Sequence, residues 1–75
     1  MTNESKTIIQ NAIAANLAAL TQRLTEAAEL AKQANEAIAQ GEQNQAIGTI
    51  LDFDRMLPEA QALYNAAMAL HRGKH

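Results

Sequence analysis

Apolar side chains recur along the first part of the chain at alternating steps of four and three residues. The row consists of Ile13, Leu17, Leu20, Leu24, Ala27, Ala31, Ala34 and Ile38. This spacing marks one face of a long α-helix and is typical of the seam of a helical bundle. Neither glycine nor proline occurs before Gly41, so we predict one helix over residues 4–40. We expect the eight side chains of the row to form the core or the oligomer contact.

A short polar connection follows at residues 41–45. Gly41 stands just past the row, where a left-handed backbone is favourable for glycine alone, and Asn44 is a candidate N-cap for the next helix. The apolar periodicity then resumes at Ala46, Ile47, Ile50, Phe53, Leu57, Ala60, Leu63, Ala67 and Leu70. The pattern predicts a second helix over residues 44–72, antiparallel to the first in a helical hairpin.

Pro58 lies inside this second predicted helix. Proline removes one backbone hydrogen bond and its ring clashes with the preceding turn, so we expect a kink or break within about three residues of Pro58. Asp54 would cap the restarted helix, and Gly48 is a second weak point. The predicted fold is therefore all-α, a single-domain hairpin over residues 1–75 whose second helix is kinked or broken.

The amino-acid composition favours self-association. Hydrophobic residues make up 48% of the 75-residue chain, but seventeen of them are alanine and only 3% of the residues are aromatic. A buried alanine methyl contributes far less than the roughly 1.5–3 kcal/mol of a buried leucine or isoleucine, so one hairpin alone would be marginally stable. We expect a homo-oligomeric bundle in which two or more hairpins cover each other's apolar side chains.

Charge and missing residue types exclude several classes of protein. The net charge of −2 argues against a general nucleic-acid-binding protein, whose affinity comes from many cations placed on phosphates. The chain has no cysteine, which excludes disulfides and thiolate metal sites and favours a reducing compartment. Its polar start and interrupted apolar runs match neither a signal peptide nor a membrane span. We expect a cytoplasmic protein with no membrane partner.

The end of the second helix carries the most distinctive chemistry. No acidic residue follows Glu59. One helix face combines an aromatic ring, a thioether and basic groups: Tyr64, Met68, His71, Arg72 and His75. On one interpretation the cations only complement the negative end of the helix dipole. On the other, several such ends meet in an oligomer and bind an anionic nucleotide, with the ring stacked on the base and Arg72 on a phosphate.

A second polar group lies just before Pro58. Asp52 and Arg55 are i, i+3 neighbours, which favours a solvent-exposed ion pair. The alternative is that Arg55, next to Phe53 and at the expected kink, binds a ligand or a partner loop. The second interpretation places Arg55 among the candidate site residues.

Catalytic and metal chemistry have little support in the sequence. His71 and His75 have the i, i+4 spacing of helical metal ligands, but no acidic third ligand lies near them. The sequence contains no candidate catalytic triad, no convincing carboxylate pair and no glycine-rich phosphate loop. We therefore expect neither an enzyme nor a protein with a metal or other cofactor.

The segment Asn44–Arg72, with its Ala69-Leu70-His71-Arg72 ending, resembles the C-terminal half of short helical proteins encoded by bacteriophages. Some of these resemble anti-defence sponges, which are oligomeric helical hairpins that sequester the cyclic nucleotide signals of CBASS or Thoeris immunity. The resemblance implies a non-enzymatic protein of the bacterial host cytoplasm that binds a cyclic nucleotide in clefts of the oligomer. The candidate ligand-binding residues come from the patterns described above and are Phe53, Arg55, Tyr64, His71 and Arg72. The alternative is a homo-oligomeric helical protein that inhibits or bridges a partner protein.

Overall fold

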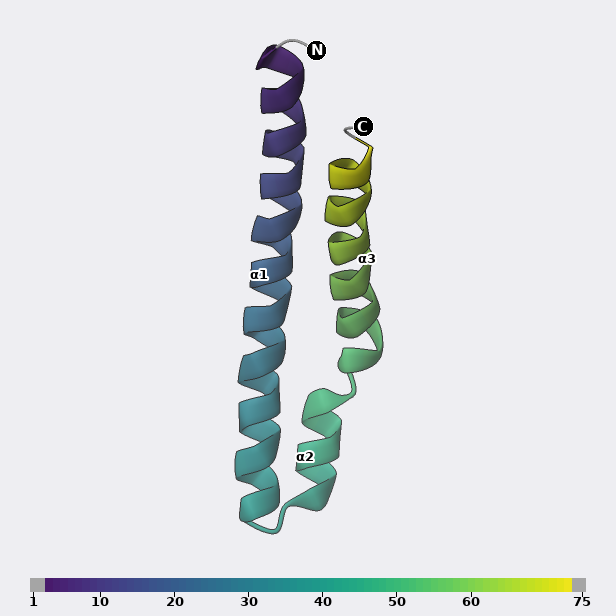
Figure 1. The fold of residues 1–75 in the computed structure, drawn as a ribbon. Helices are drawn as coiled ribbons and strands as arrows, with labels where there is room; N and C mark the ends of the chain where they lie inside the picture. The colour runs from purple at the N-terminus through teal and green to yellow at the C-terminus, as the bar shows by residue number, and fades with distance from the viewer. Residues whose placement is uncertain (1–2, 74–75) are drawn as a thin grey trace.

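The computed structural model describes residues 3–73 and shows an elongated helical hairpin (Figure 1). The first arm is one long helix, α1 (Asn3–Ala39), and the second arm consists of α2 (Gln43–Ile50) and α3 (Phe53–Arg72). The two arms run in opposite directions, so the described chain ends lie at the same end of the hairpin (Figure 1). No strand occurs within residues 3–73. The prediction of an all-α hairpin is confirmed.

The turn between the arms depends on the glycine that the sequence indicated. Gly41 has a φ of 81°, in the left-handed region. The N–H of Gly41 donates to the carbonyl of Ile38 at 3.0 Å, and the N–H of Glu42 donates to the carbonyl of Ala37 at 2.9 Å. This pair of bonds is a Schellman motif, which satisfies carbonyl groups at the end of α1. Glu42 then takes the N-cap position of α2, so the prediction of Asn44 as the N-cap is wrong.

The second arm bends at Leu51 and Asp52, between α2 and α3. Both residues keep right-handed helical dihedral angles, so the arm changes direction without leaving the helical region. The N–H of Leu51 donates to the carbonyl of Gly48 at 3.4 Å, and the N–H of Arg55 donates to the carbonyl of Asp52 at 3.0 Å. These i to i−3 bonds are of the 3₁₀ type and tighten the chain at the bend.

The expected kink within three residues of Pro58 is therefore wrong in its position. Pro58 lies inside α3, where the helix loses only the bond that a residue with an N–H would donate to the carbonyl of Asp54. The bend falls instead beside Gly48, a poor helix former. The predicted cap at Asp54 is also wrong, because Asp54 lies in the first turn of α3 and Asp52 takes the N-cap position without a side-chain cap bond.

Small side chains form the contact between the arms. The buried residues within the described part of the chain are Ala27, Ala34, Ala37, Ala46, Met56, Ala60 and Ala67. Because six of these seven are alanine, the arms approach closely but bury little apolar area. None of the described side chains is fully enclosed.

The predicted apolar row divides between two sides of α1. Four members are buried or half-buried against the second arm: Ile13, Leu20, Ala27 and Ala34. The other four are exposed: Leu17, Leu24, Ala31 and Ile38. The residues just before these exposed members are buried or half-buried in their place: Asn16, Arg23, Leu30 and Ala37. A single hairpin therefore covers only half of the row.

Two glycines provide a matched test of the turn. A Cβ atom at Gly41 or Gly48 would meet no heavy atom within 4 Å, so packing hinders neither alanine variant. We expect Gly41→Ala to lower the free energy of unfolding by about 1–2 kcal/mol, because alanine is strained in the left-handed region. Gly48→Ala should raise it by about 0.5–1 kcal/mol, because alanine is the better helix former. Urea unfolding at equal protein concentration, followed by circular dichroism, measures both changes, and a shift of the same sign for both variants would contradict the turn.

Candidate functional site

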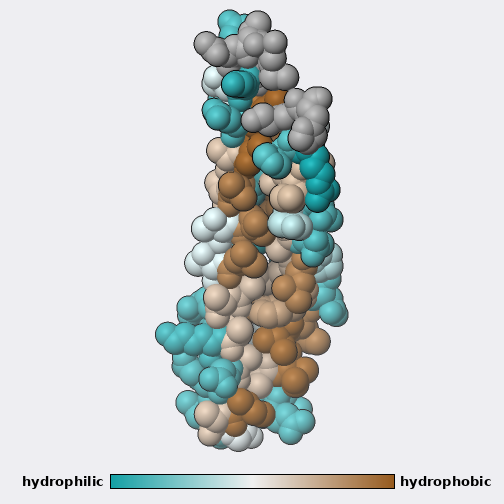
Figure 2. Space-filling view, viewed as in Figure 1, coloured by the Kyte–Doolittle hydropathy of each residue, from teal (hydrophilic) through white to brown (hydrophobic). Residues whose placement is uncertain are grey.

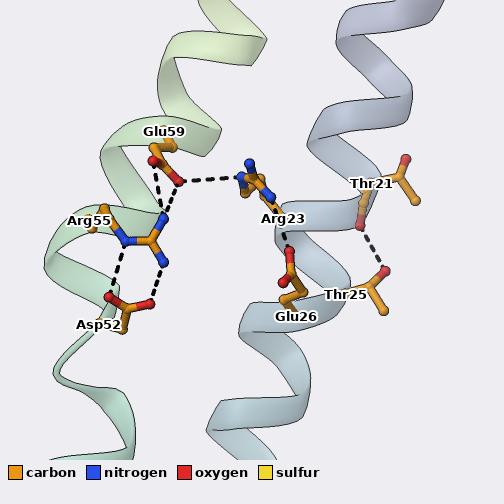
Figure 3. A network of polar contacts seen from close by, with 7 residues as sticks. All are labelled: Thr21, Arg23, Thr25, Glu26, Asp52, Arg55 and Glu59. Carbon is orange, nitrogen blue, oxygen red and sulfur yellow. Dashed lines mark hydrogen bonds and ion pairs between the residues drawn. The ribbon is translucent and has the colours of Figure 1, made fainter.

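Charged side chains form a network where α1 passes the bend (Figure 3). Arg55 donates from Nε to Oδ1 of Asp52 at 3.2 Å and from Nη1 to Oε1 of Glu59 at 3.0 Å. The same Oε1 of Glu59 lies 3.3 Å from Nε of Arg23 on α1, and Arg23 also pairs with Glu26 at 3.2 Å. The predicted ion pair of Asp52 and Arg55 is confirmed. The contact of Glu59 with Arg23 extends it into a link between the two arms.

Arg55 and Asp52 stabilise each other's charged form. The hydrogen bonds from Arg55 lower the pKa of the Asp52 carboxyl below its usual value of 3.8. Asp52 and, to a smaller extent, Glu59 raise the pKa of Arg55 above its usual range. All the side chains of the network are more than a third exposed, so water and salt screen these pairs. An anionic ligand would nevertheless meet a guanidinium that already donates to two carboxylates.

A groove of about 470 Å³ lies beside this network. Its lining consists of Arg23, Thr25, Glu26, Glu29, Leu30, Asp52, Arg55 and Met56. Three of these side chains are carboxylates and two are guanidinium groups that already bind carboxylates. The groove is therefore a poor site for a phosphate group.

Two of the predicted ligand-binding residues, Arg55 and Tyr64, do not meet within one chain. Tyr64 follows Arg55 by nine residues, which places the two side chains on opposite sides of α3. Phe53 is half-buried and Tyr64 is about half exposed. In Figure 1 α1 lies to the left of α3, whereas in Figure 3, which shows Arg55, α1 lies to the right, so Figure 3 views the hairpin from behind. Arg55 thus belongs to the face of the hairpin that is hidden in Figure 1.

The end of α3 keeps part of the predicted basic cluster together. Tyr64 and His71 are seven residues apart and share one side of the helix, and Arg72 is exposed in its last turn. Lys74 and His75 lie outside the described residues, so the spacing of His71 and His75 is not tested. Within residues 3–73, no three side chains of His, Cys, Asp or Glu come together as candidate metal ligands.

Large apolar side chains gather on the side of the hairpin opposite the network (Figure 2). We call this surface the front face and define it by seven residues, each 48–63% exposed: Leu17, Leu24, Ile38, Ile47, Leu51, Leu57 and Tyr64. Each member directly follows a residue that is buried or half-buried. In antiparallel helices these positions lie on the same flank of the contact, so the front face crosses both arms. The seven-residue spacing of Leu17 to Leu24 and of Leu57 to Tyr64 was the signal for it in the sequence.

Comparisons of the chain with protein-family models, with curated proteins and with solved structures gave no match. Within the described residues, no helix combines the length and apolarity that are needed to cross a bilayer. The function must therefore be argued from the surfaces of the hairpin itself.

The pKa of Asp52 tests the geometry of the network. Because its folded pKa lies below the unfolded one, the carboxylate stabilises the hairpin above about pH 4, and this contribution is lost as the pH falls through the folded pKa. A carbon-13 NMR titration of the carboxyl group should give a midpoint below 3.8. Arg55→Gln should return the midpoint towards that value. Arg23→Gln is the control, because Arg23 pairs with Glu26 and Glu59 instead. An unchanged Asp52 midpoint in Arg55→Gln would contradict the assigned pair.

Proposed function

We propose that the protein is a non-enzymatic helical interaction protein that works as a homo-oligomer and inhibits or bridges a partner protein. The observation that carries this proposal is the front face, with seven large apolar side chains on one side of a hairpin of 75 residues. Monomeric proteins seldom expose contiguous apolar patches larger than a few hundred Å². A patch of this kind is typical of a surface that another protein chain covers.

The small core supports the same proposal. The buried residues between the arms are six alanines and Met56. In chains this short, a single core rarely supplies more than about 3–5 kcal/mol of stability, and oligomerisation is one of the usual remedies. A second layer of helices on the front face would bury leucine, isoleucine and tyrosine side chains, which contribute more per residue than alanine.

The oligomer is tested by placing a charge in the front face. We expect the wild-type protein to elute at micromolar concentration with a mass that is a multiple of 8.1 kDa, measured by size exclusion with light scattering. Leu24→Asp should dissociate or unfold it, because the aspartate would be buried without a partner. Ile8→Asp is the matched control, since Ile8 is 67% exposed and is not part of the front face. A folded wild-type monomer, or equal dissociation by both variants, would overturn the proposal.

A second candidate function is the sequestration of an anionic cyclic nucleotide between subunits, as the phage resemblance implies. The end of α3 favours it, because Tyr64, His71 and Arg72 lie there and no acidic residue occurs in residues 60–73. Arg72 suits a phosphate better than Arg55, whose guanidinium binds two carboxylates. In this candidate, Arg72 contacts the phosphate and Tyr64 stacks on the base.

Calorimetry with cyclic dinucleotides, cyclic trinucleotides and cyclic ADP-ribose isomers tests this second candidate. Loss of a charged hydrogen bond costs about 1.5–3 kcal/mol, so Arg72→Ala should weaken binding by at least about tenfold. Arg55→Ala is the matched control and should change affinity much less. If no nucleotide binds, or if binding is unchanged in Arg72→Ala, sequestration by this site is excluded and the interaction function remains.

A further inference from the structure

The exposed side of α1 carries a second row with the spacing of a helical seam. The row consists of Gln10, Ala14, Leu17, Thr21, Leu24, Ala28, Ala31, Asn35 and Ile38. Its steps alternate between four and three residues, none of its members is charged, and all are exposed. A row of this kind fits against another helix. The second arm of the same chain cannot supply that helix, because it already packs on the neighbouring row.

A second copy of the chain fits this surface in size and chemistry. The hairpin is 59 Å long and 15 Å wide, so its broad side has a projected area of about 900 Å², close to the roughly 800 Å² that each partner buries in a standard interface. A second copy presents the same uncharged row and the same leucines. The front face can therefore be self-complementary, as a twofold interface requires.

The charges of the hairpin distinguish between the two ways of packing it on itself. In the half near the turn, residues 21–61, seven acidic residues oppose three basic ones, a net charge of −4. In the half near the chain ends, residues 3–20 and 62–73, Lys6 and Arg72 oppose Glu4, a net charge of +1. Parallel packing would place the two acidic halves side by side. Antiparallel packing places each acidic half next to the basic half of the other copy, which is electrostatically favourable.

We propose that two copies pack front face to front face as an antiparallel twofold dimer, which forms a four-helix bundle. This proposal rests on the homo-oligomer proposed above and adds the relative orientation of its two copies. The ion pair of Arg23 and Glu59 shows which residues of the two arms lie at the same level, and by this measure Leu24 and Leu57 lie at similar heights near the middle of the bundle. The two Arg72 side chains then lie at opposite ends of the dimer, and one nucleotide cannot contact both.

Spin labels on single cysteines measure the orientation directly. The chain has no cysteine of its own, so a label at Gln40→Cys is unique, and this exposed position lies at the turn end without changing the net charge. In the antiparallel dimer, the distance between the two labels measured by pulsed electron resonance should be close to the hairpin's length of 59 Å. In a parallel dimer both labels lie at the same end of the bundle, so their distance would span only the thickness of the two packed hairpins, each 12 Å thick, and would be far below that length.

Gln22→Cys is the matched control. Gln22 and Gln40 are eighteen residues apart, or five helical turns, and therefore point in the same direction from α1. A label at Gln22 lies near mid-length and should give a short distance in either orientation. A long distance at Gln40 with a short one at Gln22 supports the proposal. Short distances at both positions, with a dimer mass in light scattering, overturn the orientation and leave the interaction function intact. A monomer mass overturns both.

Discussion

The close contact of alanines between the two arms is the constraint on which the rest of the structure depends. Alanine lets the helices approach because its side chain is a single methyl group, and it favours the long uninterrupted α1. The same residues bury little area, and several of the larger apolar side chains lie outside the contact between the arms. They lie on its flank, where Leu17, Leu24, Leu57 and Tyr64 are about half exposed. Both the small core and the exposed front face thus follow from the use of alanine at the contact between the arms.

The two flanks of this contact differ in chemistry. On one flank, Arg23 and Glu59 connect the arms through an ion pair, and Arg55 extends the network to Asp52 at the bend. On the other flank lies the front face. Exposed ion pairs contribute little to stability because water and salt screen them. The network marks which residues of the two arms lie at the same level, and its charged groups lie on the flank opposite the front face.

The sequence was sufficient to predict the helices and the turn, because glycine and proline positions and a regular apolar spacing determine them locally. It was not sufficient to place the bend. Pro58 is tolerated inside α3 at the loss of one hydrogen bond, whereas the bend lies upstream at Leu51 and Asp52, three residues after the poor helix former Gly48. The division of the apolar row was also hidden, because Leu17 and Leu20 satisfy the same spacing rule although only Leu20 is half-buried against the second arm. The separation of Arg55 from Tyr64 could have been predicted from the sequence, since two side chains nine residues apart lie on opposite sides of a helix.

The position of the charges limits what a single hairpin can bind. Arg55 and Arg23 have carboxylate partners, and the groove beside them has more acidic than basic groups. Within residues 3–73, Arg72 is the arginine that lies apart from this network, at the end of α3. A site that needs two arginines outside this network must therefore draw them from two chains, so it depends on whether oligomerisation brings the ends of α3 together. In an antiparallel bundle the ends of the two α3 helices lie far apart. The distribution of charge along the hairpin therefore bears more than any single residue on whether the oligomer binds a protein or a nucleotide.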